Sequence, residues 1–222
     1  MAVFLDSRVP LWTYAITALA AYLLGSIPTG FLVAKARGID IRTVGSGNIG
    51  ATNVLRILGK PAGIAVLLAD ALKGWVAVVL VTRGVIAAFG AQATESDEDP
   101  HRIVAALCAI LGHNFTCWLR FKGGKGIATT AGVLTALVPW ALLIILAIWI
   151  VLFAVTRIVS VGSLAASVTL PIASFLTTKN WKLTLVTGAM GALAIYKHRS
   201  NIQRLLAGTE PRIGQKSEEA EA

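Results

Sequence analysis

The clearest pattern along the chain is a series of long apolar runs separated by short polar segments. A helix needs about 20 apolar residues to cross the hydrocarbon core of a bilayer, and six runs approach that length. They are residues 12–34, 62–82, 102–119, 127–156, 159–177 and 182–197. The pattern therefore predicts an all-α integral membrane protein.

The run at 127–156 is too long for one crossing. At about 1.5 Å per residue it would reach about 45 Å, whereas a hydrocarbon core is about 30 Å thick. Pro139 lies inside this run, and proline disfavours an unbroken helix because it has no N–H group to donate. We therefore expect two helices, 127–138 and 140–156, and seven transmembrane helices in all.

Composition supports a membrane class and excludes soluble, disordered and collagen-like classes. Hydrophobic residues make up 56% of the 222 residues and charged residues only 14%, with a mean hydropathy of +0.75. A soluble domain is about 45–50% apolar and about 25% charged. The net charge of +9 would suggest nucleic acid in a soluble chain. In a membrane chain, the positions of the basic residues indicate which loops are cytoplasmic, so no nucleic-acid partner is expected.

The positions of the lysines and arginines favour seven spans with the N-terminus outside. This arrangement places most of the 20 basic residues on one face, whereas six spans would divide them almost evenly. Basic residues are enriched in cytoplasmic loops, so that face is predicted to be cytoplasmic. We expect the N-terminal run to be a retained span and the acidic segment 95–99 to be a solvated outer loop.

The predicted organisation is one seven-helix membrane domain over residues 1–211 and a short polar tail over 212–222. Neither an internal repeat nor a second domain is apparent in the sequence. Cys108 and Cys117 lie in one apolar stretch, and we interpret each as a small packing residue. We expect a monomer in contact with membrane lipid.

Four polar clusters interrupt the apolar pattern, and the seven-span topology brings all four to the cytoplasmic face. They are residues 44–56, 112–126, 157–163 and 196–210. Their residue types suit phosphate: glycines expose backbone N–H groups, lysine and arginine add positive charge, and hydroxyl and amide side chains donate hydrogen bonds. The glycines are Gly47, Gly50, Gly123, Gly124 and Gly126; the cations are Arg56, Lys122 and Lys125; the neutral donors are Ser46, Asn48, Thr52, Asn53, Ser163 and Asn201.

We hypothesise that the backbone of 46–48 and 123–126 grips one phosphate and that Lys125 with Arg56 holds another. Which anion occupies which position stays open. The alternative is structural: glycines allow close helix packing in membranes, and interfacial cations can serve only to orient the chain and contact lipid head groups.

Asp70 and Lys73 are charged residues inside the second apolar run. A buried charge in a bilayer is costly and is usually paired or functional. Two interpretations stay open, namely a self-compensating structural pair and a pair that supports the phosphate site.

Several other kinds of site are excluded. Residues 123–126 lack the Ser or Thr and the upstream glycine of a Walker A loop, and no Ser lies in a Gly-x-Ser-x-Gly motif. None of His101, His113 and His198 is followed by an aspartate in a His-x4-Asp arrangement, and the three are too scattered for a catalytic zinc site. No metal or other cofactor is expected.

The clusters resemble the bacterial acyl-phosphate:glycerol-3-phosphate acyltransferases of the PlsY type over about residues 16–210. The resemblance rests on residues 45–56, 112–115 with 121–126, Thr156 to Ser163, and 198–210. Ile49 replaces a proline common in the family, and Thr116 with Cys117 replaces a more usual proline and apolar pair.

The resemblance implies a seven-helix enzyme with an external N-terminus. It would move a fatty acyl group from acyl phosphate to the 1-hydroxyl of sn-glycerol 3-phosphate, giving lysophosphatidic acid and phosphate without acyl-CoA or acyl carrier protein. The implied active-site residues are Ser46, Arg56, Lys125, Ser163, His198, Asn201 and Glu210. We expect the substrate-binding residues to be Gly47, Asn48, Gly50, Thr52, Asn53, His113, Lys122, Gly123, Gly124, Gly126, Arg157 and Arg204.

The base that accepts the hydroxyl proton stays open among His198, Glu210 and a phosphate oxygen of the donor. The absence of a triad favours the donor phosphate. The alternative function is a transporter or flippase for a phosphorylated metabolite or lipid. The location of the polar clusters at one membrane face favours the enzyme, because transporters usually place their sites near the midplane.

Overall fold

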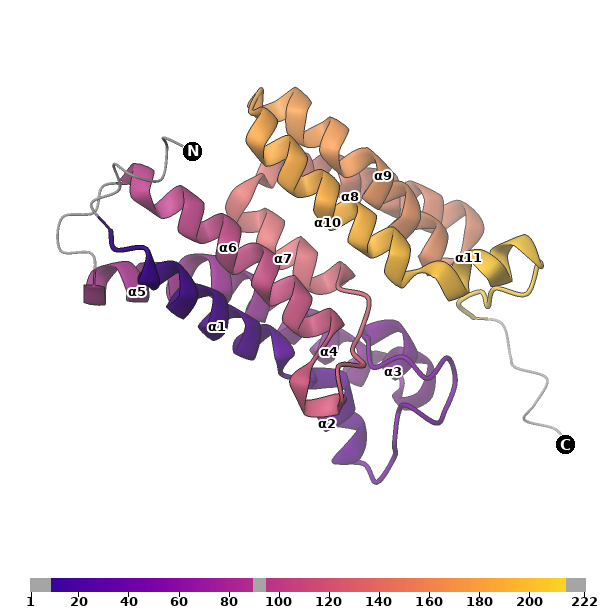
Figure 1. Ribbon diagram of the computed structural model, residues 1–222. Helices are drawn as coiled ribbons and strands as arrows, with labels where there is room; N and C mark the ends of the chain where they lie inside the picture. Colours follow the sequence, from indigo (N-terminus) through magenta and orange to yellow (C-terminus); the bar gives the residue numbers. More distant parts are fainter. Residues whose placement is uncertain (1–8, 90–94, 215–222) are drawn as a thin grey trace, which may run out of the picture. The chain divides into compact units, whose positions relative to one another are not determined.

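The computed structural model describes residues 9–89 and 95–214, and every regular element in these ranges is a helix (Figure 1). The helices divide into two compact units, Met1–Pro139 and Trp140–Ala222. Each unit is described by itself below. The prediction of one membrane domain over 1–211 stays a prediction.

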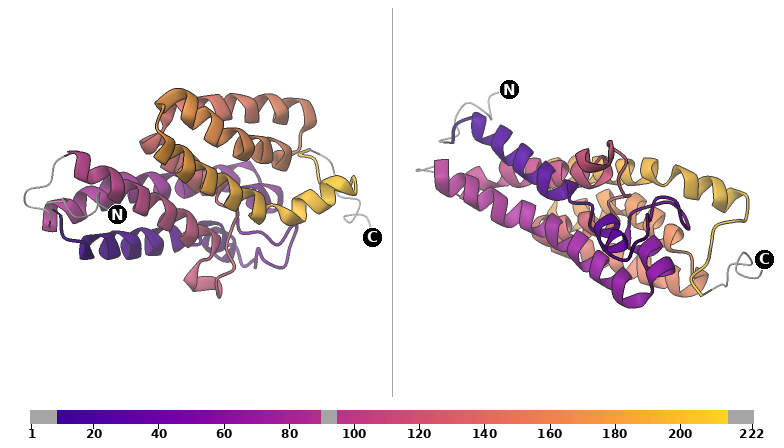
Figure 2. Two further views of the ribbon diagram at one scale, coloured as in Figure 1. Left: turned by 45° about the horizontal axis from the view of Figure 1, so that its top comes forward. Right: turned by 90° about the horizontal axis from the view of Figure 1, so that it is seen from below.

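The first unit contains the helices from α1 to α7. Their bounds are α1 Trp12–Ser26, α2 Thr29–Lys35, α3 Ala51–Leu58, α4 Lys60–Val76, the π-helical segment η2 Ala77–Val81, α5 Thr82–Phe89, α6 Glu95–Asn114, the 3₁₀ turn η3 Cys117–Leu119, and α7 Ile127–Leu137. Figure 2 shows α4, η2 and α5 following one another as a single long rod. The acidic segment 95–99, which we expected to be a loop, is helical and begins α6.

The second unit contains α8 Pro139–Thr156, α9 Val159–Thr178, α10 Trp181–Lys197 and the short α11 Arg199–Leu206. The break predicted at Pro139 is confirmed, since α7 ends at Leu137 and Pro139 is the first residue of α8. A proline suits the first helical position because its missing N–H has no partner there in any case. Asn180 caps α10 by accepting hydrogen bonds from the N–H groups of Lys182 (2.9 Å) and Leu183 (3.3 Å).

The described ranges hold five helical stretches that are long and apolar enough to cross a membrane. They are Trp12–Lys35, Lys60–Phe89, Asp99–Leu119, Pro139–Thr156 and Val159–Thr178, and a shorter apolar helix covers Ile127–Leu137. Many large apolar side chains on these stretches are exposed, among them Leu68, Leu146 and Ile172. This is the pattern of helices that face lipid, so the all-helical membrane class is confirmed. The count of seven spans and the external N-terminus stay predictions.

Small residues bring the helices of the first unit close together. A methyl group on Gly132 of α7 would lie 1.8 Å from the carbonyl oxygen of Ala71 in α4, and one on Gly25 of α1 would lie 2.1 Å from that of Ala109 in α6. Side chains at these positions would force the helices apart. Glycine therefore sets the close α4–α7 and α1–α6 contacts.

The first apolar run is one candidate span, Trp12–Lys35, as expected over 12–34, but it is not one continuous helix. It breaks at Ile27 and Pro28 into α1 and α2. Pro28 cannot donate a backbone hydrogen bond, and the break leaves the Ile27 carbonyl available to side chains. Thr29 donates its backbone N–H to this carbonyl at 3.0 Å, and Lys73 reaches it from α4 at 2.8 Å.

Candidate active site

The polar loop before α3 is held in shape by one buried asparagine. The Asn53 side chain lies on the first turn of α3 and is 2% exposed. Its amide nitrogen donates to the carbonyls of Ile41 (3.3 Å) and Val44 (3.1 Å). Its amide oxygen accepts the backbone N–H of Ser46 at 3.0 Å. Asn53, which we expected to bind substrate, has an observed structural role in folding this loop.

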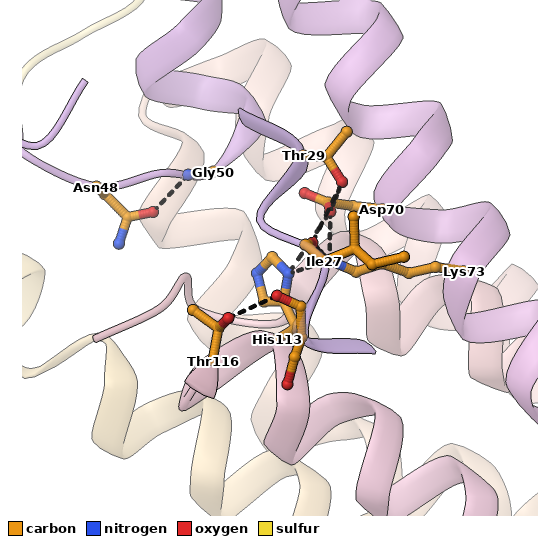
Figure 3. Close-up of polar contacts among 9 residues, drawn as sticks. Ile27, Thr29, Asn48, Gly50, Asp70, Lys73, His113 and Thr116 are labelled. Carbon is orange, nitrogen blue, oxygen red and sulfur yellow. Dashed lines mark hydrogen bonds and ion pairs between the residues drawn. The ribbon is translucent and has the colours of Figure 1, made fainter. Parts of the chain in front are cut away.

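Backbone N–H groups of the same loop donate within the chain. Besides the Ser46 group, the Gly47 N–H bonds the carbonyl of Val44 at 3.0 Å. The Gly50 N–H bonds the side-chain oxygen of Asn48 at 2.9 Å (Figure 3). Both the Ser46 and the Gly47 N–H groups are already hydrogen-bonded, so they would have to lose these bonds to bind a phosphate, and that hypothesis stays a prediction. Gly47 has a different reason to be glycine, namely its φ of +66°.

The side chains of this loop face outward. Ser46 and Arg56 are exposed, and Asn48 and Thr52 are partly exposed. At the base of the loop, Arg42 forms an ion pair with Asp40 at 2.6 Å, and the hydrogen bonds from Arg42 lower the pKa of that carboxyl to about 2. The loop therefore offers these side chains to a ligand, while its Ser46, Gly47 and Gly50 N–H groups are hydrogen-bonded within the chain.

The glycine-rich segment 121–126 packs directly on the end of α6. The N–H of Gly123 donates to the carbonyl of Asn114 (3.2 Å), and the N–H of Gly124 donates to the carbonyl of His113 (3.0 Å). A methyl group on Gly124 would lie 2.1 Å from Nε2 of the His113 ring. These two N–H groups would also have to lose their bonds to hold a phosphate, so this expectation stays a prediction.

The remaining residues of this segment are placed differently. Gly126 caps α7 with a φ of +82°, and a methyl group on it would lie 2.8 Å from the Asn114 side chain. Lys122 is exposed and Lys125 is half-buried. The segment therefore presents its two lysines on a backbone that His113 and Asn114 shape.

A buried polar network lies beside this segment (Figure 3). The Lys73 ammonium bonds Asp70 Oδ1 at 2.7 Å, the Ile27 carbonyl at 2.8 Å and His113 Nδ1 at 3.0 Å. Asp70 also accepts the hydroxyl of Thr29 at 3.0 Å. The Asp70 and Lys73 side chains are 3% and 6% exposed. The pair is thus joined to His113, a predicted site residue, so it is more than a self-compensating pair.

Contacts around η3 bring the two clusters of the first unit together. Leu119 lies in one apolar core with Ile41, Ile49 and Val54, which surround the first loop. The Thr116 hydroxyl donates to the carbonyl of Ser26 at 2.5 Å. Both positions that differ from the family's usual residues therefore have a structural role. Ile49 packs in this core, and Thr116 forms a hydrogen bond that a proline could not make.

Glu210 is the centre of the polar cluster in the second unit. Its Oε1 accepts Ser160 Oγ (2.7 Å) and Asn201 Nδ2 (2.5 Å), and its Oε2 accepts Arg204 Nε (2.7 Å). The Glu210 side chain is 7% exposed. Burial by itself would raise the pKa of this carboxyl, but the hydrogen bonds from Asn201, Ser160 and Arg204 outweigh it and lower the pKa below its ordinary value.

His198 and Ser163 are buried against their own helices. His198 is 3% exposed, and its Nδ1 lies 2.7 Å from the carbonyl oxygen of Ala194, so Nδ1 must carry a proton. Ser163 is 1% exposed; its hydroxyl donates to the Val159 carbonyl at 2.9 Å and accepts the indole N–H of Trp149 at 3.2 Å. The Ser163 hydroxyl already uses its donor within the unit.

An open hollow lies beside Glu210. It has a volume of about 440 Å³ and is lined by Arg157, Gly208, Glu210, Arg212, Ile213 and Gly214. Arg157 has a left-handed backbone with φ of 59°, and its carbonyl accepts the N–H of Ile213 at 2.9 Å. This bond draws the chain that follows α11 back to the start of α9.

Comparison with known proteins gives the family. The sequence profile described as Glycerol-3-phosphate acyltransferase matches residues 15–208. The chain belongs to this family. The resemblance found in the motifs is thereby confirmed, and the chain is an acyltransferase.

Curated members of the family are similar over nearly their whole length. The glycerol-3-phosphate acyltransferase of Thermosynechococcus vestitus is 46% identical over 198 residues, which cover 89% of this chain and 93% of the relative. The protein of the same name from Clostridioides difficile is 44% identical over 209 residues, which cover 94% and 99%.

Solved structures agree with the fold. The crystal structure of PlsY, an integral membrane glycerol 3-phosphate acyltransferase, in its glycerol 3-phosphate form has a TM-score of 0.80 and 38% identity, and the match covers 90% of this chain and 96% of that one. Its lysophosphatidic acid form has a TM-score of 0.77 and 37% identity, with 90% and 95% covered.

The residues that the family resemblance implied fall into two observed groups. In the first unit, the clusters at 44–56 and 112–126 meet through Leu119. In the second unit, the clusters at 157–163 and 196–210 meet through Ser160 and Glu210. That all four clusters serve one site, and the roles of the individual residues, stay predictions.

Sequence reasoning did not assign a role to several residues that the geometry places in these groups. Ser160 and Trp149 hold predicted site residues in the second unit, and Thr29 joins the Asp70 and Lys73 network. The sequence signal that could have identified each of them is a side chain with a hydrogen-bonding group in an apolar helix, because such a group needs a partner in a bilayer.

Proposed function

We propose that this acyltransferase moves a fatty acyl group from acyl phosphate to the 1-hydroxyl of sn-glycerol 3-phosphate at the cytoplasmic face of the inner membrane. The observation that carries the proposal is the near full-length similarity to an enzyme solved in both a glycerol 3-phosphate form and a lysophosphatidic acid form. Those two molecules are the acceptor and the product of such a transfer.

The reaction requires little activation by the protein. The acceptor hydroxyl oxygen attacks the acyl carbonyl carbon, the bond from that carbon to the phosphate oxygen breaks, and inorganic phosphate leaves. Phosphate is a good leaving group, so positioning of two anions and stabilisation of developing negative charge supply most of the rate enhancement. Arg56, Lys122 and Lys125 carry cationic groups suited to this purpose.

We assign the hydroxyl proton to a phosphate oxygen of the donor. Both carboxylate oxygens of Glu210 already accept hydrogen bonds from protein donors, and its pKa is lowered, so it is a poor proton acceptor at neutral pH. His198 donates from Nδ1 to the Ala194 carbonyl, so only its Nε2 could accept the proton, and the kcat of His198→Ala distinguishes this nitrogen from the donor phosphate. In this assignment Glu210 holds Asn201 and Arg204 in place.

The test supplies the purified protein in detergent or liposomes with a long-chain acyl phosphate and glycerol 3-phosphate. We expect equimolar release of lysophosphatidic acid and inorganic phosphate, and no product when acyl-CoA replaces acyl phosphate. Product from acyl-CoA alone would overturn the donor assignment. Movement of labelled glycerol 3-phosphate into vesicles without chemical change would support the alternative function, a transporter.

A further inference from the structure

The buried network at the α1–α2 break fixes the hydrogen-bonding state of His113. An ammonium group has three N–H donors and no acceptor. Those of Lys73 have partners in Asp70 Oδ1, the Ile27 carbonyl and His113 Nδ1. Because Lys73 can only donate, Nδ1 of His113 must be the acceptor and carries no proton.

The other contact of Nδ1 does not change this conclusion. Asp70 Oδ1 lies 3.6 Å from His113 Nδ1, which is too long for a hydrogen bond. The protonation state therefore follows from the hydrogen bond that Nδ1 accepts from Lys73. The ring is therefore neutral, and its proton is on Nε2.

Nε2 of His113 lies against the segment that carries Lys125. The position of a methyl group on Gly124 would be 2.1 Å from Nε2, and the N–H of Gly124 bonds the His113 carbonyl at 3.0 Å. The ring and the backbone of His113 thus contact the same glycine. A rotation of the ring would displace Gly124 and, with it, Lys125 on the next residue.

We propose that Lys73, held by Asp70, is a positioning residue for the acyl transfer: it fixes His113 as the Nε2–H tautomer, and His113 in turn sets the 123–126 segment that carries Lys125. The proposal deepens the proposed function and rests on it for the role of Lys125. It explains why a charged pair is kept within an apolar helix, where charge is costly.

A spectroscopic test reads the tautomer without any turnover. The chain has three histidines, so ¹⁵N-labelling of histidine gives a spectrum simple enough to assign by single substitutions. We expect His113 to show a protonated Nε2 and an unprotonated Nδ1 at neutral pH. Thr13 uses its only hydroxyl proton on the Pro10 carbonyl (2.6 Å), so His101, at 2.9 Å from Thr13, must also donate from Nε2. His101 therefore serves as an internal reference for a protonated Nε2.

His198 provides a reference for a protonated Nδ1, since its Nδ1 donates to Ala194. A wild-type His113 with a protonated Nδ1, alone or together with Nε2, would overturn the proposal. This result is independent of whether acyl phosphate is the donor, so it separates failure of the inference from failure of the proposed function.

A kinetic test reads the consequence for the site. Asp70→Asn/Lys73→Met removes the pair without leaving an unpaired charge. We expect kcat/KM to fall about 10- to 100-fold, since displacement of a positioning group by about 1 Å can cost up to this much. The substrate whose KM rises should be the one whose KM rises in Lys125→Ala.

The control and a double-mutant cycle distinguish positioning from general destabilisation. Asp40→Asn/Arg42→Met removes an exposed ion pair of the same unit and should leave kcat/KM within about 2-fold of wild type. Adding His113→Ala to the Asp70/Lys73 variant should cost little more than His113→Ala does alone, because both act through one group. Additive losses, or unchanged kinetics in a folded Asp70/Lys73 variant, would contradict the proposal. If that variant fails to fold, the ¹⁵N spectrum of wild-type His113 still tests the proposal.

Discussion

At the residue scale, several polar groups that the sequence suggests for phosphate binding have hydrogen-bond partners within the protein. The sequence shows serine, asparagine and glycine in loops that suit phosphate, yet Ser46, Gly47, Gly123 and Gly124 use their N–H groups on the protein itself. A backbone N–H has one proton, so a group that is already bonded within the chain must lose that bond before it can hold a ligand. Positive side chains and loop shape therefore carry the anion-binding proposal.

His198 tests the assignment of the hydroxyl proton. We expect His198→Ala to lower kcat less than 10-fold at saturating substrates, because a phosphate oxygen of the donor accepts the proton. An essential general base contributes about 10²–10⁴ in rate. The measurement is steady-state kcat of the purified variant, with thermal unfolding to show that it is folded. A loss of 100-fold or more in a folded variant would assign the base to His198.

Glu210→Gln should destabilise the protein and lower its activity. The glutamine amide nitrogen would face the donor of Arg204 or those of Ser160 and Asn201, so at least one donor loses its acceptor. Hydrogen bonds to a charged group are worth about 1.5–3 kcal/mol. The expected effect is a lower midpoint of thermal unfolding in detergent. An unchanged midpoint would show that the three contacts contribute no net stability.

The same carboxyl predicts a pH dependence of stability. Although burial raises the pKa of Glu210, the hydrogen bonds from Asn201, Ser160 and Arg204 lower it below its ordinary value of 4.5, so folding favours the ionised form. Its contribution is complete above about pH 4.5 and is lost as the pH falls through the lowered folded pKa. Wild type should lose more stability than Glu210→Gln between pH 5 and about pH 3. Parallel curves for the two proteins would contradict this role.

At the element scale, proline and glycine determine where helices end and how closely they pack. Pro139 could be identified from the sequence as a break because the apolar run around it was too long for one crossing. Pro28 lay in a run of ordinary length, so the length of the run did not indicate that α1 and α2 are separate. The π-helical segment η2 likewise had no signal in a uniformly apolar stretch.

Gly124→Ala tests the packing of the glycine-rich segment on α6. The added methyl group would meet the His113 ring at 2.1 Å, so the segment must move. We expect activity to fall about 10-fold or more, since the lysine beside it moves as well. Gly84→Ala is the matched control, because a methyl group there meets nothing within 4 Å. It should keep wild-type activity. Equal activity of the two variants would mean that the 123–126 segment tolerates the shift.

At the scale of the whole molecule, the family and the membrane class follow from features spread over nearly the entire chain. Apolar runs and the asymmetry of basic residues predict topology because each reports a local cost of transfer into lipid. The structure bears out the helical class, since residues 9–89 and 95–214 hold five helical stretches long enough to span a membrane. The sidedness of the loops is a property of the protein in a bilayer and is tested there.

Cysteine accessibility checks the predicted topology. In a variant without Cys108 and Cys117, single cysteines would replace Ser46, Ser200 and Asn180, which are exposed. We expect a membrane-impermeant thiol reagent applied to inverted vesicles to label Ser46→Cys and Ser200→Cys, and the same reagent on intact cells to label Asn180→Cys. Labelling of positions 46 and 200 from opposite sides would end the proposal that all four polar clusters share one membrane face.

The sequence by itself determined the membrane class, the break at Pro139, the family and the residue types that a phosphate site requires. These features depend on composition, periodicity and short motifs, which are local. Only the tertiary structure decided which N–H groups are occupied, that Asn53 and Glu210 organise their loops, and that Lys73 bonds a histidine 40 positions away. Such contacts join helices that are distant in sequence, and their partners depend on how the helices pack, which no local pattern encodes.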